Sequence, residues 1–302
     1  MSDITPVVSD DHNERAGSQQ RTQSDKKTHH IKGSIFRIKA IAEKHGLDAM
    51  ISEDTPSKSL FERALLREKQ RKELRQKNLE LILKVALDSC QDEIAGEPDH
   101  DWLLRFLDLA QDIHNHSMQK LWAQVLKREV TKPGSTSLKA LKVLKNMTPN
   151  EAQTLQKAAS LACSFGSDNS KKLLLGIKSQ TGFFLFSRRE SVDALSLGEF
   201  QLPYSSLLIL VELGIVLGTE LESGVIEIEP ALKLSYQGKE YTLQPKSKGT
   251  TMTYYRFTPT GNELCQLLGN RSNPRYQEKL VELLNRKFQV QSDVRSHFYH
   301  KV

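Results

Sequence analysis

The sequence predicts a mainly α-helical protein with a C-terminal α+β part, in which a helical bundle precedes a small antiparallel sheet. Two observations predict this fold class. Apolar residues recur at helical spacing up to Gly166, and beyond it many of them alternate with polar residues. Capping and turn residues also separate the apolar segments at the expected boundaries. The change of period therefore divides the chain into a helical part and a mixed part.

Composition restricts the class of protein. The 302 residues are 38% hydrophobic and 26% charged, with a net charge of +6, which is typical of a soluble globular protein. These values exclude a wholly disordered chain, a collagen-like chain and a disulfide scaffold. The sequence has no run of about 18 apolar residues and no signal-peptide pattern. We therefore expect a cytoplasmic protein with no membrane partner.

Residues 1–30 are polar almost throughout, and we expect them to form a disordered arm. They hold too few apolar side chains to offset the conformational entropy that ordering would cost. His29 and His30 stand at the end of this arm and are interpreted as solvent-exposed tail residues rather than metal ligands.

Residues 31–95 predict N-terminal helices. Apolar residues from Ile31 onward indicate a short helix that ends near Gly46. The stretch from Ser59 to Cys90 contains neither glycine nor proline and predicts one long helix.

The middle of this long helix is strongly basic, with seven basic residues between Arg63 and Lys77 against two acidic ones. A helix that is polar on every side either spans solvent or contacts a partner. Two interpretations stay open: an exposed connecting helix, or a surface for acidic protein partners. The candidate partner-binding residues are Arg63, Arg67, Arg71, Lys72 and Arg75.

Residues 96–166 predict a compact bundle of four helices. Each helix follows candidate N-cap residues, which are Asp99 or Asp101, Asn115 or Ser117, Ser135 or Ser137, and Thr148. The last helix has a capping box, Thr148 to Glu151, with proline at the first helical position. The turns between the helices are short, which favours antiparallel neighbours.

Residues 167–302 predict the α+β part. We expect strands at Leu173–Ile177 and Gly182–Phe186, joined by a turn at Lys178–Thr181. Further strands are expected at Val225–Glu229, Leu232–Tyr236, Tyr241–Leu243, Met252–Phe257 and Phe288–Val290. Helices are expected in the apolar stretch Pro203–Val216, where a buried helix stops near Gly214, from Thr258 to Gly269, and from Pro274 to Arg286.

Two resemblances add to this interpretation. Met118–Glu129 and Pro133–Leu141 resemble a segment shared by uncharacterised bacterial proteins, and the whole chain resembles a conserved gammaproteobacterial family of unknown function. This resemblance implies a bacterial cytoplasmic protein and no particular activity. Leu210–Val216 and Phe257–Leu264 resemble parts of winged-helix domains, so the C-terminal part is predicted to be winged-helix-like. Many winged helices bind proteins, so the resemblance does not fix the partner.

Nucleic-acid binding requires cations that neutralise phosphates, and aromatic side chains help where bases are unstacked. The stretch from Lys239 to Arg256 and the basic tail beyond it have this composition, with tyrosines between the cations. The opposing interpretation is that the tyrosines fill the sheet core and the lysines lie on a solvent-exposed loop. The candidate nucleic-acid-binding residues are Lys239, Lys246, Lys248, Arg256, Arg271 and Arg275.

Other chemistries receive little support. His114 and His116, with Asp112 and His100 nearby, lack a second cluster that would complete a metal site. Ser117-Met118-Gln119-Lys120 matches a serine-acylase motif, but its Met118 belongs to the apolar stripe of a bundle helix. The three cysteines contain no CxxC pair and are expected to be reduced thiols. No cofactor is predicted.

The sequence therefore favours a non-enzymatic regulatory or protein-interaction module, acting on an unknown protein partner or by self-association. The alternative is a nucleic-acid-binding protein that uses the basic hairpin and tail. A hydrolase or metal-dependent enzyme is the second alternative.

Overall fold

The computed structural model describes residues 33–51, 58–91, 93–181, 189–269 and 271–293. Contacts divide the chain into two compact units, an N-terminal unit of residues 1–68 and a C-terminal unit of residues 69–302. The boundary between Glu68 and Lys69 falls inside a long helix.

The two helices expected before residue 95 are confirmed as α1 (Ser34–Lys44) and α2 (Leu60–Ser89). Ser59 and Glu62 form a reciprocal capping box, because the side chain of each accepts the backbone N–H of the other, at 3.2 and 2.8 Å. These bonds to Ser59 lower the pKa of the Glu62 carboxyl. The 30-residue helix has three buried residues, Asn78, Ile82 and Ala86, all in its second half.

The four helices expected within residues 96–166 are confirmed as well. They are α3 (His100–Ala110), α4 (His116–Thr131), α5 (Leu138–Asn146) and α6 (Pro149–Leu161). Each is capped by one of the predicted residues: Asp99, Asn115, Ser137 and Thr148 accept backbone N–H groups from the first turns. Ser117 is therefore not the cap of α4, because Asn115 accepts the Ser117 and Met118 N–H groups.

Aromatic side chains fill the bundle core. Trp102 stacks on Phe106 with 5.3 Å between ring centroids, and Phe106 tilts against Trp122 at 5.4 Å. The indole N–H of Trp102 donates to the Thr136 carbonyl at 2.7 Å. Glu129, only 1% exposed, accepts hydrogen bonds from three residues of the α4–α5 loop, which fixes that loop on α4.

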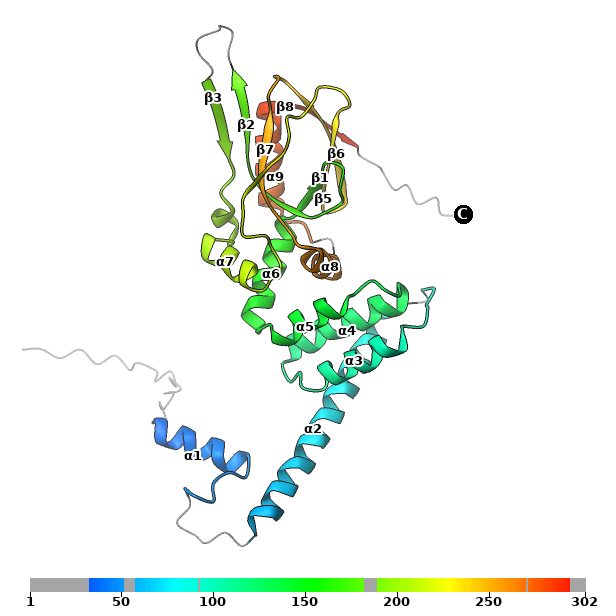
Figure 1. Ribbon diagram of the computed structural model, residues 1–302, viewed down its shortest axis with the longest axis vertical. Coiled ribbons are helices and arrows are strands. Elements are labelled where there is room, and N and C mark those ends of the chain that lie inside the picture. Colours follow the sequence, from blue (N-terminus) through cyan, green and yellow to red (C-terminus); the bar gives the residue numbers. More distant parts are fainter. Residues whose placement is uncertain (1–32, 52–57, 92, 182–188, 270, 294–302) are drawn as a thin grey trace, which may run out of the picture. The chain divides into compact units, whose positions relative to one another are not determined.

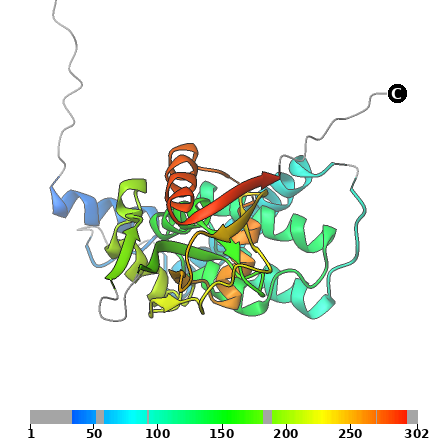
Figure 2. The same ribbon diagram turned by 90° about the horizontal axis from the view of Figure 1, so that it is seen from above.

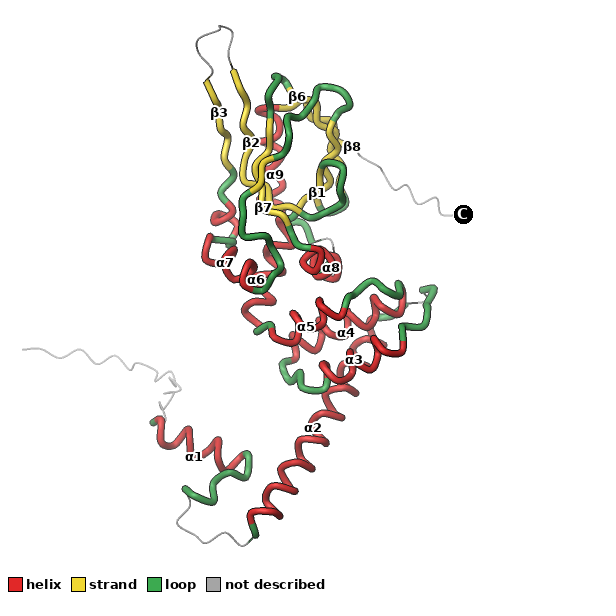
Figure 3. The backbone as a smooth tube through the Cα atoms, viewed as in Figure 1, coloured by secondary structure: helices red, strands yellow, loops and turns green. Residues whose placement is uncertain are grey.

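The C-terminal part contains an antiparallel sheet of eight strands within the described residues. The strands are β1 (Cys163–Phe165), β2 (Lys172–Thr181), β3 (Arg189–Ala194), β4 (Leu221–Glu222), β5 (Leu232–Tyr236), β6 (Lys239–Pro245), β7 (Thr251–Arg256) and β8 (Phe288–Asp293). They follow the order β4-β7-β2-β1-β5-β6-β8, and β3 pairs with β2. The sheet curls, with β3 and β2 at one side and β6 and β8 at the other (Figure 3).

The helical elements of this part are η1 (Leu197–Phe200), α7 (Tyr204–Glu212), α8 (Pro259–Leu267) and α9 (Pro274–Lys287). Helix α9 lies against β2 and β8, so it covers one face of the sheet, as Figures 1 and 2 show. Thr258 caps α8, as predicted, and Gly269 after it has a φ of +69°, a conformation that glycine adopts without strain.

The bundle and the sheet share one hydrophobic core, which extends from Ile82 on α2 to Phe288 on β8. Tyr236, Tyr276 and Phe200 meet at its centre, with Phe200 edge-on to Tyr276 at 5.1 Å. The bundle therefore packs against the sheet part through apolar surface that each of them contributes.

Two predicted elements are wrong. Lys178–Thr181 is not a turn but the end of β2, because Val192 to Arg189 of β3 pair with it. Gly182–Phe186 lies outside the described residues. Val225–Glu229 is not a strand: the Ile226 N–H donates to the Thr250 carbonyl, but no ladder forms there. Alternation alone cannot form a strand without a neighbouring edge to pair with.

The sheet is also larger than the small sheet expected. Cys163, two residues after the end of α6, begins β1 in the middle of the sheet. The winged-helix resemblance stays a prediction. No helix in the described part of the chain has the length and apolarity that crossing a membrane requires.

Helix α8 closely approaches the segment after α7 at Gly261. A Cβ atom at this position would lie 2.1 Å from the Ile215 carbonyl oxygen, whereas a Cβ at Gly224 would meet nothing within 4 Å. We predict that Gly261→Ala lowers the free energy of unfolding by about 1–3 kcal/mol, because backbone must move to admit the methyl group. Gly224→Ala is the matched control and should change it by less than about 0.5 kcal/mol. Urea denaturation measures both, and equal effects would contradict the packing described.

Candidate functional site

The six predicted nucleic-acid-binding residues lie at two ends of the sheet. Lys239 and Arg256 share one cross-strand row, through the pairs Tyr236–Lys239 and Lys172–Arg256 on either side of β1. Arg271 and Arg275 flank the start of α9, which lies at the same end because the Asn273 N–H donates to the Tyr236 hydroxyl. Lys246 and Lys248 follow the other end of β6, seven and nine residues from Lys239.

Several of these cations have partners inside the chain. Arg256 pairs with Asp168 at 2.6 Å between Nη2 and Oδ2, and Arg275 lies over the Phe200 ring at 5.9 Å. The Lys246 ammonium donates to the Asn285 carbonyl at 2.6 Å. The structure therefore does not bring the six residues together on one surface.

The tyrosines between these cations belong to the sheet. Tyr241 is buried, and its hydroxyl accepts from the Gln277 amide at 2.9 Å. Tyr254 is half-buried and meets Phe165 edge-on at 5.2 Å. These rings are held by packing within the sheet and by a hydrogen bond from α9.

An ion pair between a buried lysine and a partly exposed aspartate lies beside Arg256. The Lys172 ammonium, on a side chain only 4% exposed, donates to Asp168 Oδ1 at 2.5 Å and to the Phe165 carbonyl at 2.7 Å. It also lies 4.9 Å from the centre of the Phe165 ring. The hydrogen bond from Lys172 is the main reason that the pKa of the Asp168 carboxyl lies below its usual range.

The predicted partner-binding residues on α2 differ in their contacts and exposure. Arg75 binds Asp112 through two hydrogen bonds, of 2.8 and 3.3 Å, and so fixes α2 to the turn after α3. Arg63 donates to the Lys58 carbonyl at 2.5 Å. Arg67, Arg71 and Lys72 are exposed.

The histidine cluster does not converge on an ion site. Asp112 is engaged by Arg75 and Lys145, and His114 Nδ1 lies 3.1 Å from the side-chain nitrogen of Asn78. Across the described ranges, no three His, Cys, Asp or Glu side chains come close enough to hold a metal.

An apolar groove lies within the N-terminal unit. The segment after α1 meets the first turns of α2 and encloses about 200 Å³ between them. Its apolar lining comes from Leu47, Met50, Leu60 and Ala64, and the two guanidinium side chains of Arg63 and Arg67 complete it. Both arginines belong to the basic run that the sequence shows between Arg63 and Lys77, whereas the apolar lining has no such signal in the sequence.

The N-terminal unit also exposes many large apolar side chains. The most exposed among those described are Ile35, Ile38, Ile41, Met50, Leu60, Phe61 and Leu65, with exposed fractions from 59% to 99%. Two of them, Met50 and Leu60, line the groove, and exposed apolar surface of this kind is typical of a region that contacts a partner.

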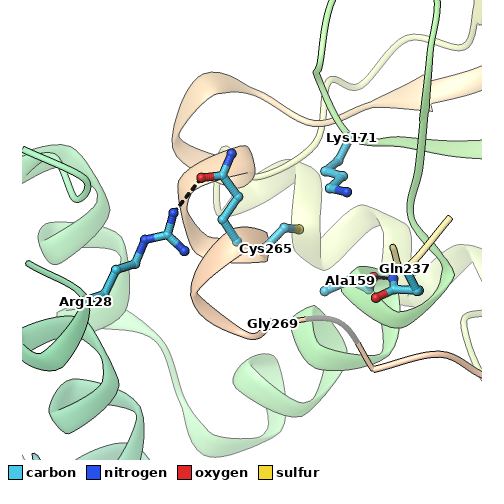
Figure 4. A pocket seen from close by; sticks show the side chains of 7 residues that line it. Arg128, Ala159, Lys171, Gln237, Cys265 and Gly269 are labelled. Atoms are coloured by element: carbon cyan, nitrogen blue, oxygen red, sulfur yellow. Dashed lines mark hydrogen bonds between the residues drawn. The ribbon is translucent and has the colours of Figure 1, made fainter. Parts of the chain in front are cut away.

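A second cavity, of about 340 Å³, lies in the C-terminal unit (Figure 4). It is lined by residues from α4, α6, the start of β2, the β5–β6 turn and α8, which are Arg128, Ala159, Lys171, Gln237, Cys265, Gln266 and Gly269. None of these was singled out as a site residue, because they are spread over 142 positions and no local motif connects them.

The three thiols are free and differ in exposure: Cys90 is exposed, whereas Cys163 and Cys265 are buried. Burial raises the pKa of Cys163 to about 12 and raises the pKa of Cys265 further. Two of the three thiols are therefore shielded from solvent, and the reduced state of the cysteines stays a prediction.

The chain belongs to a family described as protein of unknown function (DUF2806), whose sequence model matches residues 62–281. Comparison with curated protein sequences and with solved structures gives no match.

Thiol reactivity follows from this burial. We predict that Ellman's reagent modifies Cys90 rapidly in the folded protein at pH 8, whereas Cys163 and Cys265 react only slowly, since the thiolate is the nucleophile. Denaturant should make all three react at similar rates. Cys90→Ser is the control and should remove the fast phase; a fast phase that persists would contradict the burial of the other two.

The Asp168–Lys172 pair predicts a pH-dependent contribution to stability. Asp168→Asn leaves the buried ammonium with carbonyl partners alone and should lower the free energy of unfolding at pH 7 by about 1–2 kcal/mol, a value reduced for the partial exposure of Asp168. Because the folded pKa of Asp168 is depressed, its contribution is present above the unfolded pKa and is lost as pH falls through the folded pKa. Urea denaturation from pH 7 to pH 2 should therefore show the variant and wild type converging, and a constant difference would contradict this.

Proposed function

We propose that this DUF2806 member is a non-enzymatic, cytoplasmic protein-interaction module with a regulatory role in a bacterial cell. Its partner offers an apolar segment flanked by acidic side chains. The observation that carries the proposal is the groove between the α1–α2 segment and the first turns of α2, with its apolar lining and two guanidinium groups.

The length of α2 supports this function. Its residues from Leu60 to Lys77 include none that is buried, so this half of the helix keeps its apolar side chains exposed. A helix with an unburied apolar stripe gains stability when a partner covers that stripe. The groove therefore suits a helix or an extended segment that inserts one or two apolar side chains.

Charge indicates which partner fits. Between Arg63 and Lys77 the helix carries seven basic residues and two acidic ones, so an acidic partner is attracted and a second basic helix is repelled. Arg67 lines the groove and is exposed, with no partner among the described residues. Its guanidinium is therefore available to a carboxylate.

We predict that a fluorescent, helical peptide of about 18 residues, with leucines at helical spacing and glutamates beside them, binds the full chain. Arg67→Glu should weaken this binding about tenfold or more, because a rim charge is reversed. Lys84→Glu, at an exposed position in the second half of α2, makes the same change in charge away from the groove and should have little effect. Fluorescence anisotropy measures the three affinities.

Several outcomes would contradict the proposal. An equal loss of peptide affinity in the two variants would show that only overall charge matters. If a peptide with lysines in place of the glutamates bound equally well, the proposal that the partner is acidic would be wrong. Sedimentation as a dimer that Leu60→Asp dissociates would assign the groove to a second copy of this chain.

Nucleic-acid binding is the alternative proposal. It is supported by Lys239, Arg271 and Arg275, which lie at the end of the sheet where α9 begins. Duplex DNA, single-stranded DNA and RNA titrated at about 50 and 200 mM salt test it, because phosphate neutralisation gives a steep loss of affinity over that range.

A further inference from the structure

Two cations point into the cavity between α4, α6 and α8. Arg128 reaches it from α4, and Lys171 reaches it from the residue before β2 (Figure 4). Lys171 and Lys172 are neighbours in the sequence, but their side chains have separate environments. The Lys172 ammonium pairs with Asp168 and donates to the Phe165 carbonyl. Alternation along an extended chain explains why one ammonium is buried in an ion pair and the next one lines a cavity.

Neither cation has a carboxylate partner among the described residues. Arg128 donates from Nη2 to Gln266 Oε1 at 2.7 Å, while its Nε is buried without a hydrogen-bond partner. The Lys171 backbone N–H donates to Asn262 Oδ1, and no described group accepts from its ammonium. The Nε atom is buried and closed to the cavity, so an oxyanion there meets the terminal nitrogens of Arg128 and the Lys171 ammonium, the two cationic groups of the lining.

The nearby carboxylates are committed elsewhere. Glu129 accepts from the Gly134 and Thr136 N–H groups, and Glu263 accepts from the Ser137 N–H at 2.8 Å. Burial lowers the pKa of Arg128. The negative charges of Glu129 and Glu263 act in the opposite direction, but their effect is smaller. The guanidinium therefore sits in surroundings that favour an added negative charge.

The remaining lining groups can recognise the other end of a ligand. The Gln237 amide donates to the Ala159 carbonyl at 2.7 Å, which leaves its side-chain oxygen able to accept. The carboxyl end of α8 also reaches the cavity at Gly269, and the carbonyl groups there attract hydrogen-bond donors. A ligand that fits carries an oxyanion at one end and N–H or O–H donors at the other.

We propose that this cavity binds a small phosphorylated molecule with hydrogen-bond donors, of about mononucleotide size, through Arg128 and Lys171. The volume of about 340 Å³ exceeds what a single inorganic ion needs and lies within the usual range for small-molecule sites. The oxyanion accepts from the Arg128 guanidinium and the Lys171 ammonium, and the donors face Gln237 and the end of α8.

Three probes separate the two ends of the ligand: inorganic phosphate, adenosine and adenosine monophosphate, each titrated into the full chain by calorimetry at millimolar concentration. Adenosine monophosphate should bind more tightly than phosphate, and adenosine should not bind measurably. Arg128→Gln and Lys171→Gln should each weaken nucleotide binding about tenfold, as expected for the loss of a charge-assisted hydrogen bond. Lys157→Gln, an exposed lysine on α6 outside the cavity lining, is the matched control.

Cys265 provides a second readout that does not depend on these substitutions, since it lines the same cavity. In Cys90→Ser protein, adenosine monophosphate should slow maleimide modification of Cys265 and leave Cys163 unchanged, as mass spectrometry resolves. Absence of binding by phosphate and by the nucleotide would overturn the proposal. So would equal losses in the Lys157 control, or nucleotide binding no tighter than phosphate binding.

Discussion

The hydroxyl group of Tyr236 joins three parts of the C-terminal unit. It donates to the Ser160 carbonyl at 2.8 Å near the end of α6, and it accepts from the Asn273 N–H at 2.9 Å at the start of α9. Its ring is fully buried and lies 5.4 Å from that of Tyr276. One side chain on β5 therefore holds the last bundle helix, the sheet and the covering helix in register, which is why bundle and sheet share one core.

This junction also positions the cavity. Gln237, the residue after Tyr236, has a φ of +49°, and its amide donates to the Ala159 carbonyl on α6. Arg128 reaches Gln266 on α8 from the opposite side. Hydrogen bonds from both sides thus fix α6 and α8, two of the helices that line the cavity.

The sequence predicted what depends on neighbours along the chain. Thr148, Asn115 and Asp99 cap their helices because a side-chain oxygen reaches N–H groups two or three residues away. What depends on distant pairing was missed or wrong. The composition of Lys178–Thr181 predicts a turn, yet these residues continue β2 because β3 pairs with them. Cys163 joins the sheet because it pairs with Tyr236, 73 positions away in the sequence.

The same reasoning explains the candidate sites. Arg63 and Arg67 were recognisable because they belong to a run of charge, a property of sequence alone. Arg128 and Lys171 were not, since a single arginine on a bundle helix and a lysine before a strand have no distinctive spacing. Their significance arises when Asp168 is taken by Lys172 and Arg256, and Glu263 by Ser137. The network of ion pairs decides which cations remain without a carboxylate partner. Only the folded chain specifies that network, so the sequence alone could not identify these two cations.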